Sequence, residues 1–486
     1  MNNYLTTNRN NSPYPHLLDA LLILTFNDDV SLTQNEDEQI VLASLHHKLT
    51  FKAVQPGLKK ALFALANNGA TLEAMNNWVQ QDRGEFIVLK FYQYLQKFTR
   101  FGWLCHSVVT KGCLIATAKP MTTDCQFLLA TAVAHNQYVL SKFAYVHQVN
   151  GQMILESPLS KMVIHLLSWQ AIAIVGLLAN PCSCREIATQ IQGIELDTIQ
   201  QFISLLLSTQ MLSEVAEDGA ISEQTDIILA QWEFHDLLFH SRSRSGRHAN
   251  PVGGTYRFLG QSAPLPALKP RTGDKSITLY KPDLENLKTS DIPFTQVLES
   301  RKSIREHGEM PITAQQLGEF LYRCVRIRNL LQTEKGELLS RPYPSGGAMY
   351  ELELYPVVNR CQDILPGLYY YQPQAHELCC ISSETEAVEA LLKGASMAMG
   401  KQEIPQVLIV ITARFQRLAW KYESIAYALM LKHVGALYQT MYLVATAMNL
   451  APCGIGTGDS DLFAKAAGCN YYAETSVGEF VLGSGT

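Results

Sequence analysis

The chain has 486 residues, of which 47% are hydrophobic and 17% charged, and its formal net charge is -5. This composition excludes a largely disordered or fibrous protein and, at about 150 residues per domain, indicates several globular domains. The slight negative charge gives no global electrostatic reason to expect nucleic acid or an anionic membrane surface as a partner.

The amino-terminal residues, Met1 to His16, are rich in Asn and Thr and lack the apolar stretch of a secretory signal. The purest apolar runs, such as Ala171 to Ala179, fall far short of the about 20 residues that span a bilayer. The 11 cysteines include no C-x-x-C pair, so we expect neither a metal site nor a disulfide framework. These features predict a cytoplasmic protein with reduced cysteines.

Two segments of the first half resemble each other, residues 62–75 and 175–188. Each reads as an apolar helix, a turn and a short helix that begins after a small capping residue. A longer helix follows in each case, over Phe86 to Leu104 and over Asp197 to Leu212, and a β wing is expected after it. The pattern predicts two winged-helix-like modules, over residues 1–150 and 151–240.

Winged helices usually bind DNA, but the candidate recognition helix of the second module contains no Lys or Arg between Asp197 and Gln210. The corresponding helix of the first module has a few cations, as is typical of an ordinary solvated face. We therefore favour a module that captures a peptide by pairing it with the strand edge of the wing. A purely structural or dimerising role stays open, and no nucleic-acid partner is expected.

A stretch rich in Ser, Arg, Gly and Pro begins at Ser241, and it predicts a linker over residues 241–290. The remainder, residues 291–486, contains short alternating strands. The strands are expected after the turn at Pro344, at Gly367 to Tyr371, at Gln406 to Thr412 and at Gly478 to Gly483. They predict an α+β domain with a central antiparallel or mixed sheet.

A helix that begins near Phe294 is expected to end in a cationic cluster of four polar residues, which are Arg301, Lys302, Ser303 and Arg305. Arg grips phosphate oxygens with two N–H groups, Lys adds a point charge, and a Ser hydroxyl donates a further hydrogen bond. Taken alone, the cluster is more typical of a solvated basic helix end. The turn that follows later in the chain, Pro344-Ser345-Gly346-Gly347, has adjacent glycines that let the backbone approach a flat ligand.

The longest helical pattern runs from Lys421 to Leu450 and is apolar almost all round. Such a helix is buried on every side, at a domain centre or at a subunit interface. Its main apolar face consists of Tyr427, Leu431, Val434, Tyr438, Met441 and Ala445. The loop Gly454-Ile455-Gly456 is no dinucleotide fingerprint, because the third glycine would fall at Asp459 and a helix precedes it.

Four motifs occur in a characteristic order: R-K-S-I-R, P-Y-P-S-G-G-A-M-Y-E-L-E-L-Y, L-A-W-K-Y-E before the long helix, and G-I-G. Together they resemble the azoline oxidase (SagB-type dehydrogenase) branch of the FMN-dependent nitroreductase superfamily. The resemblance covers about Pro293 to Thr486. The two modules ahead of this domain resemble those of the oxidases of cyanobactin maturation, where they are taken to recognise peptides.

The resemblance implies an FMN cofactor at a homodimer interface. Its phosphate and ribityl end would be held by Arg301, Lys302, Ser303 and Arg305. Its isoalloxazine would be lined by Pro344, Ser345, Gly346 and Gly347 of the other subunit and by Gly454, Ile455 and Gly456, with Gln439 as a lesser polar contact. Many nitroreductases add a basic residue near the carboxyl end. This chain ends in Gly485-Thr486, so the phosphate would depend more on the Arg301 cluster.

Lys421-Tyr422 matches the Lys-Tyr pair of the azoline oxidase branch. Conversion of a thiazoline or oxazoline to an azole removes two electrons and two protons. Lys421 would take the ring proton, Tyr422 would relay it or orient the ring, and the electrons would pass to O₂. Without the resemblance, Lys421 is typical of a surface lysine at a helix amino terminus.

Two other functions stay open on sequence grounds. One is an NAD(P)H-dependent nitroreductase that acts on a small molecule. The other is a flavin-sensing DNA-binding regulator, which the amino-terminal modules would allow.

Overall fold

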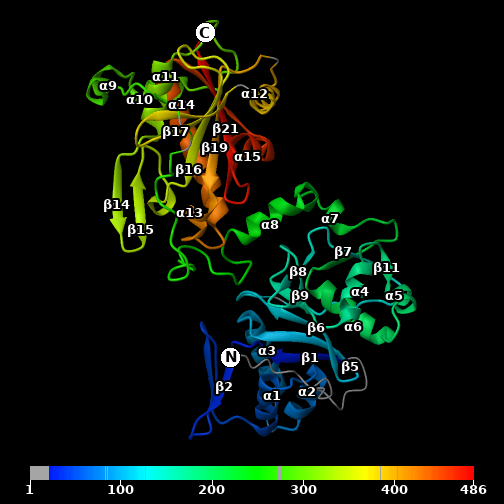
Figure 1. Cartoon of the computed structure of the whole chain (residues 1–486). Coiled ribbons are helices and arrows are strands. Elements are labelled where there is room, and N and C mark those ends of the chain that lie inside the picture. Colours follow the sequence, from blue (N-terminus) through cyan, green and yellow to red (C-terminus); the bar gives the residue numbers. More distant parts are fainter. Residues whose placement is uncertain are drawn as a thin grey trace, which may run out of the picture. The chain divides into compact units, whose positions relative to one another are not determined.

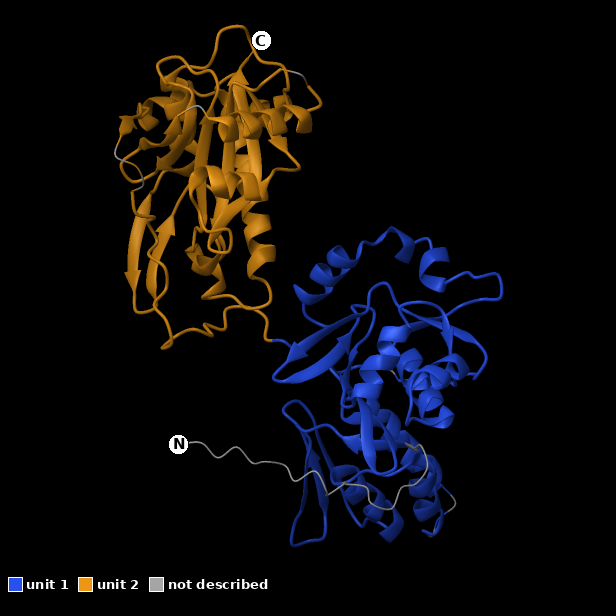
Figure 2. Ribbon diagram, turned by 45° about the vertical axis from the view of Figure 1, so that its right-hand side comes forward, with its two compact units in different colours: residues 1–250 blue, residues 251–486 orange. Residues whose placement is uncertain are grey.

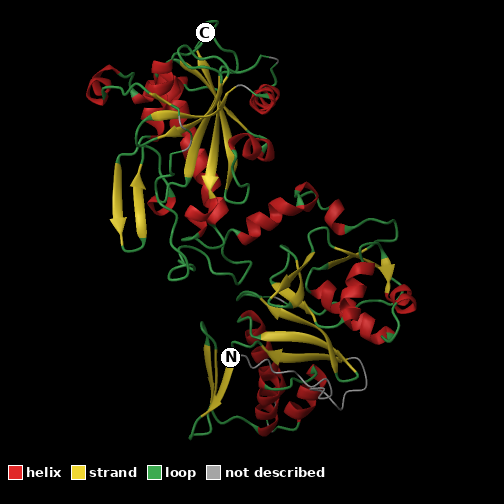
Figure 3. Ribbon diagram, viewed as in Figure 1, coloured by secondary structure: helices red, strands yellow, loops and turns green. Residues whose placement is uncertain are grey.

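The computed structural model describes residues 21–485, apart from Arg83, Glu85, Gln126, Thr272, Asp274, Glu384 and Gln402. Figure 2 shows the division of the chain into two compact units, residues 1–250 and 251–486. Helices and strands occur in both units (Figure 3), which confirms the expected α+β class. Met1 to His16 lie outside the described residues. Within the described part of the chain, no helix is long and apolar enough to cross a bilayer.

Among the described residues, the first unit starts with strand β1 (Leu21–Phe26) and a small antiparallel sheet, which is followed by three helices. The sheet contains β2 (Ser31–Gln34), β3 (Ile40–Ala43) and β4 (Lys48–Phe51), and the helices are α1 (Pro56–Ala66), α2 (Leu72–Gln80) and α3 (Ile87–Arg100). The Oγ1 atom of Thr71 accepts a hydrogen bond from the Ala74 amide and so caps α2. The long third helix lies within the range expected from the sequence.

A second set of three helices follows later in the same unit: α4 (Trp169–Leu177), α5 (Cys184–Gln190) and α6 (Leu196–Ser208). Ser183 and Glu186 form a reciprocal capping box that fixes the start of α5. α6 buries an apolar face that includes Ile199, Phe202 and Leu206. This burial explains why the helix is rich in leucine and free of cations.

The strands between and after these helices form two further sheets of the first unit. The larger sheet has the order β1-β5-β6-β10-β9-β8, with β5 (Leu104–Thr110), β6 (Cys113–Pro120), β8 (Tyr145–Val149), β9 (Gln152–Glu156) and β10 (Met162–Leu166). The smaller one has the order β11-β7-β12, with β7 (Gln137–Leu140), β11 (Cys182–Ser183) and β12 (Leu212–Glu214). The wing strands β5 and β6 thus have neighbours on both sides. In the described wings, β12 is the strand that lies at a sheet edge.

The buried His106 on β5 makes the stability of this unit depend on pH. Its ring stacks on Phe127 at 3.7 Å, and neither ring nitrogen has a hydrogen-bond partner among the described residues. Burial lowers the pKa of His106 from 6.5 to about 3. The folded state therefore keeps the ring neutral while the unfolded chain takes up a proton. The contribution of the neutral His106 to the free energy of unfolding is present at pH values well above 6.5 and is lost as the pH falls from 6.5 toward 3.

We expect the free energy of unfolding to fall by about 1.4 kcal/mol per pH unit once the pH is well below the unfolded-state pKa. Chemical denaturation between pH 7.5 and 5 measures this slope. His106→Phe keeps an aromatic ring against Phe127 and removes the proton, so its slope should be shallower by that amount. Equal slopes in the two proteins would contradict the assignment.

The second unit is built on a seven-stranded antiparallel sheet with the order β13-β18-β17-β16-β19-β21-β20. Figure 1 labels β16, β17, β19 and β21 of this sheet. Its strands are β13 (Ser276–Thr278), β16 (Leu352–Val358), β17 (Gly367–Gln372), β18 (Glu377–Ser383), β19 (Val407–Arg414), β20 (Leu450–Ile455) and β21 (Glu474–Ser484). The four strands expected from the sequence are all present. A separate hairpin is formed by β14 (Asn329–Thr333) and β15 (Gly336–Ser340).

Helices cover both faces of this sheet. One face packs against α11 (Ala314–Val325) and α14 (Ala426–Ala447), and the other packs against α12 (Glu386–Ala398) and α15 (Ser460–Ala467). The strand residues divide between the faces with the period of two that a pleated strand requires. On β16, for example, Leu354 belongs to the core beside α14, whereas Tyr355 belongs to the core beside α12.

The long helix differs from its prediction in both extent and burial. α14 begins at Ala426, because Ser424 adopts a left-handed φ of 60° and interrupts the helical path. Lys421 and Tyr422 therefore lie in the loop that follows the short helix α13 (Phe415–Ala419). The helix is also not buried all round. Tyr427 and Leu431, predicted for its main apolar face, are 48% and 39% exposed.

The cationic cluster also differs from its prediction, because it lies beyond the helix. α10 spans Phe294–Ser300, and Arg301 leaves it with an extended ψ of 125°. The Ile304 amide then donates a hydrogen bond to the Pro452 carbonyl of β20, at 2.8 Å. The cluster thus runs along the edge strand of the main sheet.

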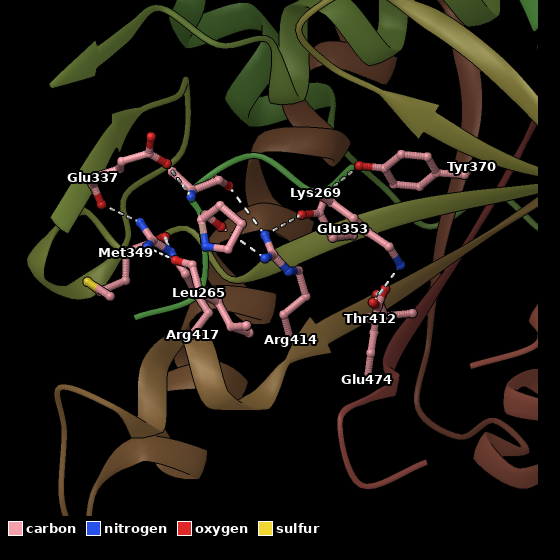
Figure 4. A network of polar contacts seen from close by, with 12 residues as sticks. Leu265, Lys269, Glu337, Met349, Glu353, Tyr370, Thr412, Arg414, Arg417 and Glu474 are labelled. Atoms are coloured by element: carbon pink, nitrogen blue, oxygen red, sulfur yellow. Dashed lines mark hydrogen bonds and ion pairs between the residues drawn. The ribbon is translucent and has the colours of Figure 1, made fainter. Parts of the chain in front are cut away.

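Residues 251–270, here called the strap, fall within the predicted linker and are tied to the second unit. Arg414 and Arg417 donate hydrogen bonds to the carbonyls of Pro266 and Leu265, and Lys269 pairs with Glu474 at 2.5 Å. Figure 4 shows Arg414 and Arg417 reaching into this segment from the end of β19 and from α13. Because buried Arg side chains saturate backbone carbonyls here, the strap has a fixed path over the domain.

Candidate flavin site

One group of predicted site residues is joined by Tyr442, on the carboxyl-terminal half of α14. The Tyr442 hydroxyl lies 2.8 Å from the Ser303 Oγ and accepts a hydrogen bond from the Gly454 amide at 2.7 Å. The Arg301 guanidinium lies over the Tyr442 ring, 5.1 Å from its centroid. Tyr442 thereby links the cationic cluster to the loop after β20. We call this group, with Arg305, the edge half-site.

The cations of the edge half-site are available to an anion. Within the described part of the chain, Arg301, Lys302 and Arg305 form no ion pair, and Lys302, Ser303 and Arg305 are exposed. Burial raises the pKa of the Cys453 thiol on β20, and the charge of Arg305 opposes this rise, so Arg305 lies near the strand. Unpaired guanidinium groups beside a hydroxyl form a donor set that suits a phosphate.

A second group surrounds the predicted glycine turn. The Gly346 amide donates a hydrogen bond to the His433 Nε2 at 2.7 Å, and the His433 Nδ1 lies 2.7 Å from the Glu351 Oε1. Because Nε2 accepts a hydrogen bond, the proton must be on Nδ1, which donates to the carboxylate. Glu351 is completely buried. This buried chain of hydrogen bonds runs from Glu351, the residue before β16, through His433 of α14 to Gly346 and fixes the position of the turn.

Gly347 brings the turn against the predicted catalytic pair. Its φ is 60°, and a Cβ there would collide with the Lys421 Nζ and would lie 2.6 Å from the Tyr422 hydroxyl. The Lys421 ammonium donates a hydrogen bond to the Gly347 carbonyl at 3.3 Å. A glycine is therefore required here both by backbone conformation and by space. We call Ser345, Gly346, Gly347, Lys421 and Tyr422 the turn half-site.

The two half-sites lie on opposite flanks of α14. His433 and Tyr442 are nine residues apart, which corresponds to about 13 Å of rise and about half a turn of rotation. Within a single chain, the cationic cluster lies near Gly454 and the glycine turn lies near Lys421. The two half-sites are therefore separated from each other by α14.

Three other predicted residues have different surroundings. Pro344 is exposed at the start of the turn. Ile455 is buried in the core on the α12 side, and its carbonyl accepts a hydrogen bond from the Tyr438 hydroxyl at 3.3 Å. Gln439 is exposed on α14, and no hydrogen bond to another described residue involves its side chain.

Sequence reasoning missed the residues that hold the half-sites in place, namely Glu351, His433 and Tyr442. Glu351 is an acidic residue at the start of a buried strand, and His433 is a polar residue in a largely apolar helix. Each of these mismatches is a signal of a buried hydrogen-bonded pair. Tyr442 gives no such signal, because an aromatic residue in an apolar helix is most simply a core residue.

The second unit is an oxidoreductase domain of the nitroreductase type, because the model of the nitroreductase family matches residues 298–483. Two further family models match the first unit: the ThcOx helix-turn-helix domain over residues 18–129 and the cyanobactin oxidase ThcOx over residues 138–249. Together the three models cover most of the chain. The chain belongs to the cyanobactin oxidase ThcOx family and carries a nitroreductase domain.

Curated relatives match part of the chain. A protein of Methanocaldococcus jannaschii named as a nitroreductase is 29% identical over 181 residues, which are 37% of this chain and 84% of that protein. The microcin B17-processing protein McbC of Escherichia coli is 31% identical over 23% of this chain and 42% of its own length. The trifolitoxin-processing protein TfxB of Rhizobium leguminosarum is 30% identical over 26% of this chain and 35% of its own length. The chain thus spans less than half of the two processing proteins.

Proposed function

We propose that the protein oxidises azoline rings of a ribosomally made peptide to azoles, with FMN as cofactor and O₂ as the final electron acceptor. Membership of the cyanobactin oxidase family supports an azoline substrate, and two relatives are named for the processing of peptides. The observation that carries the proposal is the contact of Lys421 and Tyr422 with Gly347, which joins a proton acceptor to a turn shaped for a flat ligand.

The residues present fit an FMN, which the nitroreductase family typically binds. The unpaired cations of the edge half-site suit its phosphate. The turn half-site offers backbone without side-chain bulk, because a Cβ at Gly347 has no room. FMN held by these residues would supply a two-electron acceptor for a hydride from the substrate, and O₂ would be the final electron acceptor.

A homodimer would complete the site. In one chain the half-sites face opposite flanks of α14, so a two-fold axis beside this helix would bring the edge half-site of one copy against the turn half-site of the other. The solvent-facing side of α14 suits such packing. It carries the exposed Tyr427, Leu431, Gly435 and Gln439, and a Cβ at Gly435 would meet no atom within 4 Å.

In this arrangement the chain's own residues perform the proton chemistry. Lys421, when neutral, takes the proton from the ring carbon, and Tyr422 beside it orients the ring or passes the proton on. The Gly347 carbonyl holds the Lys421 nitrogen at the turn. The Glu351–His433 pair holds that turn, because His433 accepts a hydrogen bond from the Gly346 amide and donates one in turn to the buried Glu351 carboxylate.

The first unit would capture the peptide by strand addition. β5 and β6 lie inside their sheet, whereas β12, the strand that follows α6, lies at the edge of its own sheet in the described part of the chain. An extended peptide could pair there through its backbone. The eleven cysteines are all free thiols, as suits a reducing compartment, and we expect the protein to act in the cytoplasm.

Two measurements test this function. The purified protein should show the absorbance spectrum of a flavin, and an azoline peptide incubated with it in air should lose the mass of two hydrogens per ring. Mixing in the absence of O₂ should bleach the flavin with the azoline peptide and not with NADPH. Rapid bleaching by NADPH together with an unchanged peptide mass would favour a small-molecule nitroreductase instead.

A further inference from the structure

The strap carries Tyr256 to the proposed base. The backbones of Gly253 and Glu423 pair with each other, and the Tyr256 amide donates a hydrogen bond to the Lys421 carbonyl at 3.1 Å. Further along, the Trp420 indole donates to the Ser262 carbonyl at 2.9 Å. Successive contacts thus align the strap with the loop that holds Lys421.

Tyr256 is held in a conformation that a tyrosine rarely adopts. Its φ is 54°, in the left-handed region, which is strained for a residue with a bulky side chain. Its ring meets two ammonium groups: the Lys335 Nζ lies 4.3 Å from the ring centroid and the Lys421 Nζ lies 5.5 Å from it. The Trp420 ring contacts it edge-on at 5.8 Å. Backbone strain of this kind persists where the surrounding structure fixes the residue, and it is common at active sites and ligand-binding sites.

A cavity of about 380 Å³ opens beside this ring. Tyr256, Leu338, Met349 and Trp420 give it apolar and aromatic walls, and the tip of the β14–β15 hairpin forms its rim. The rim residues are Thr333, Glu334, Lys335 and Glu337. Lys421 also lines the cavity, so a group bound there lies next to the proposed base.

Two lysines and two glutamates line this cavity. Among the described residues, neither Lys335 nor Lys421 forms an ion pair. The Glu337 carboxylate already accepts hydrogen bonds from the Ala267 amide and the Gln332 side chain. Glu334 is exposed at the tip of the hairpin. The two ammonium groups are the charges that lie against the Tyr256 ring.

We propose that this cavity binds the side chain next to the azoline, with Tyr256 as its stacking platform and Lys335 as a specificity residue. The proposal rests on the proposed function. Apolar and aromatic side chains gain contact with the walls, and cationic side chains are disfavoured by Lys335 and Lys421. Tyr256 is in addition a positioning residue for Lys421, because its ring attracts the ammonium group that reaches the Gly347 carbonyl.

A set of azoline peptides tests the specificity. The peptides differ in one residue beside the ring, which is Leu, Phe or Lys. We expect the KM for the Lys peptide to exceed that for the Leu peptide by about tenfold, because Lys335 repels the cationic side chain. Lys335→Met should largely remove this difference in KM. Lys393→Met, on α12 and paired with Glu389, is the matched control and should leave the preference unchanged. Equal KM values for the three peptides with the unaltered protein would overturn the proposal.

Chemical labelling of amines tests the role of Tyr256 without relying on turnover. The rate at which Lys421 is acylated by a water-soluble ester is read by peptide mass spectrometry, with Lys393 as the internal reference. Tyr256→Leu and Tyr256→Asn should speed the labelling of Lys421 severalfold, whereas Tyr256→Phe, which keeps the ring, should not. Asn tolerates the left-handed conformation, so this variant should fold at least as well as the unaltered protein.

The labelling result and the azoline reaction can fail separately. Unchanged labelling of Lys421 in both ring-deficient variants overturns the positioning role even when azoles form normally. Faster labelling in Tyr256→Leu and Tyr256→Asn supports the positioning role even if the unaltered protein never oxidises an azoline. In that case the proposed function is overturned and the positioning role is kept.

Discussion

Lys421→Ala should abolish azole formation while the protein keeps its FMN. General-base catalysis typically contributes about 10²–10⁴-fold to a rate, so kcat for the azoline peptide should fall by that factor. The flavin should stay bound, because Lys421 is held by the Gly347 carbonyl and by two aromatic rings and lies apart from the cationic cluster. Mass measurement of the peptide gives the rate, and the absorbance of the purified variant gives the flavin content.

Two control variants separate the base from its surroundings. Tyr422→Phe removes a hydroxyl and keeps the ring under the Lys421 ammonium, so its effect should be smaller. Lys432→Ala removes an exposed cation from α14 and should leave the rate unchanged. Full turnover by Lys421→Ala would show that another group takes the proton.

Arg301→Ala combined with Arg305→Ala should yield a protein without flavin. A hydrogen bond to a charged group contributes about 1.5–3 kcal/mol, so the loss of both guanidinium groups should weaken FMN binding by about 10²–10⁴-fold. The yellow colour should be absent after purification, and titration with FMN should show the higher Kd.

Lys401→Ala serves as the control for the loss of a nearby cation. Lys401 pairs with Glu306, which directly follows the cluster, at 2.7 Å. Its removal should leave flavin occupancy unaffected. Normal occupancy in the double arginine variant would refute the phosphate role of the cluster.

Much of the fold could be predicted from the sequence because its elements have strong local signals. The strands of the second unit alternate apolar residues between turns, and the helices of the first unit follow capping residues such as Thr71 and Ser183. The six-stranded sheet of the first unit was not foreseen. Its strands pair across long stretches of chain, as β1 does with β5, and such pairing leaves no periodic mark in either strand alone.

The candidate site could be predicted in parts, and the contacts between the parts could not. The motifs picked out residues of both half-sites, but the close approach of Lys421 to Gly347 was not predicted from them. The predicted end of α10 and the predicted start of α14 were wrong, because a contact with a distant segment of the chain ends or delays each helix. Ile304 pairs with Pro452 beyond α10, and Glu423 pairs with Gly253 ahead of α14. The strap, with Tyr256, falls in the segment predicted as a linker. A composition rich in Pro and Gly does not reveal that buried arginines bind the carbonyls of this segment.

Subunit complementation tests most directly that two copies build each flavin site. Arg301→Ala/Arg305→Ala disables the edge half-site, and Gly347→Val disables the turn half-site, so each variant alone should be colourless and inactive. After the two are unfolded together in equal amounts and refolded, mixed dimers contain one site made of two intact halves. The account predicts recovery of about a quarter of the normal flavin content and activity. No recovery, in a mixture shown by mass to contain mixed dimers, would contradict it.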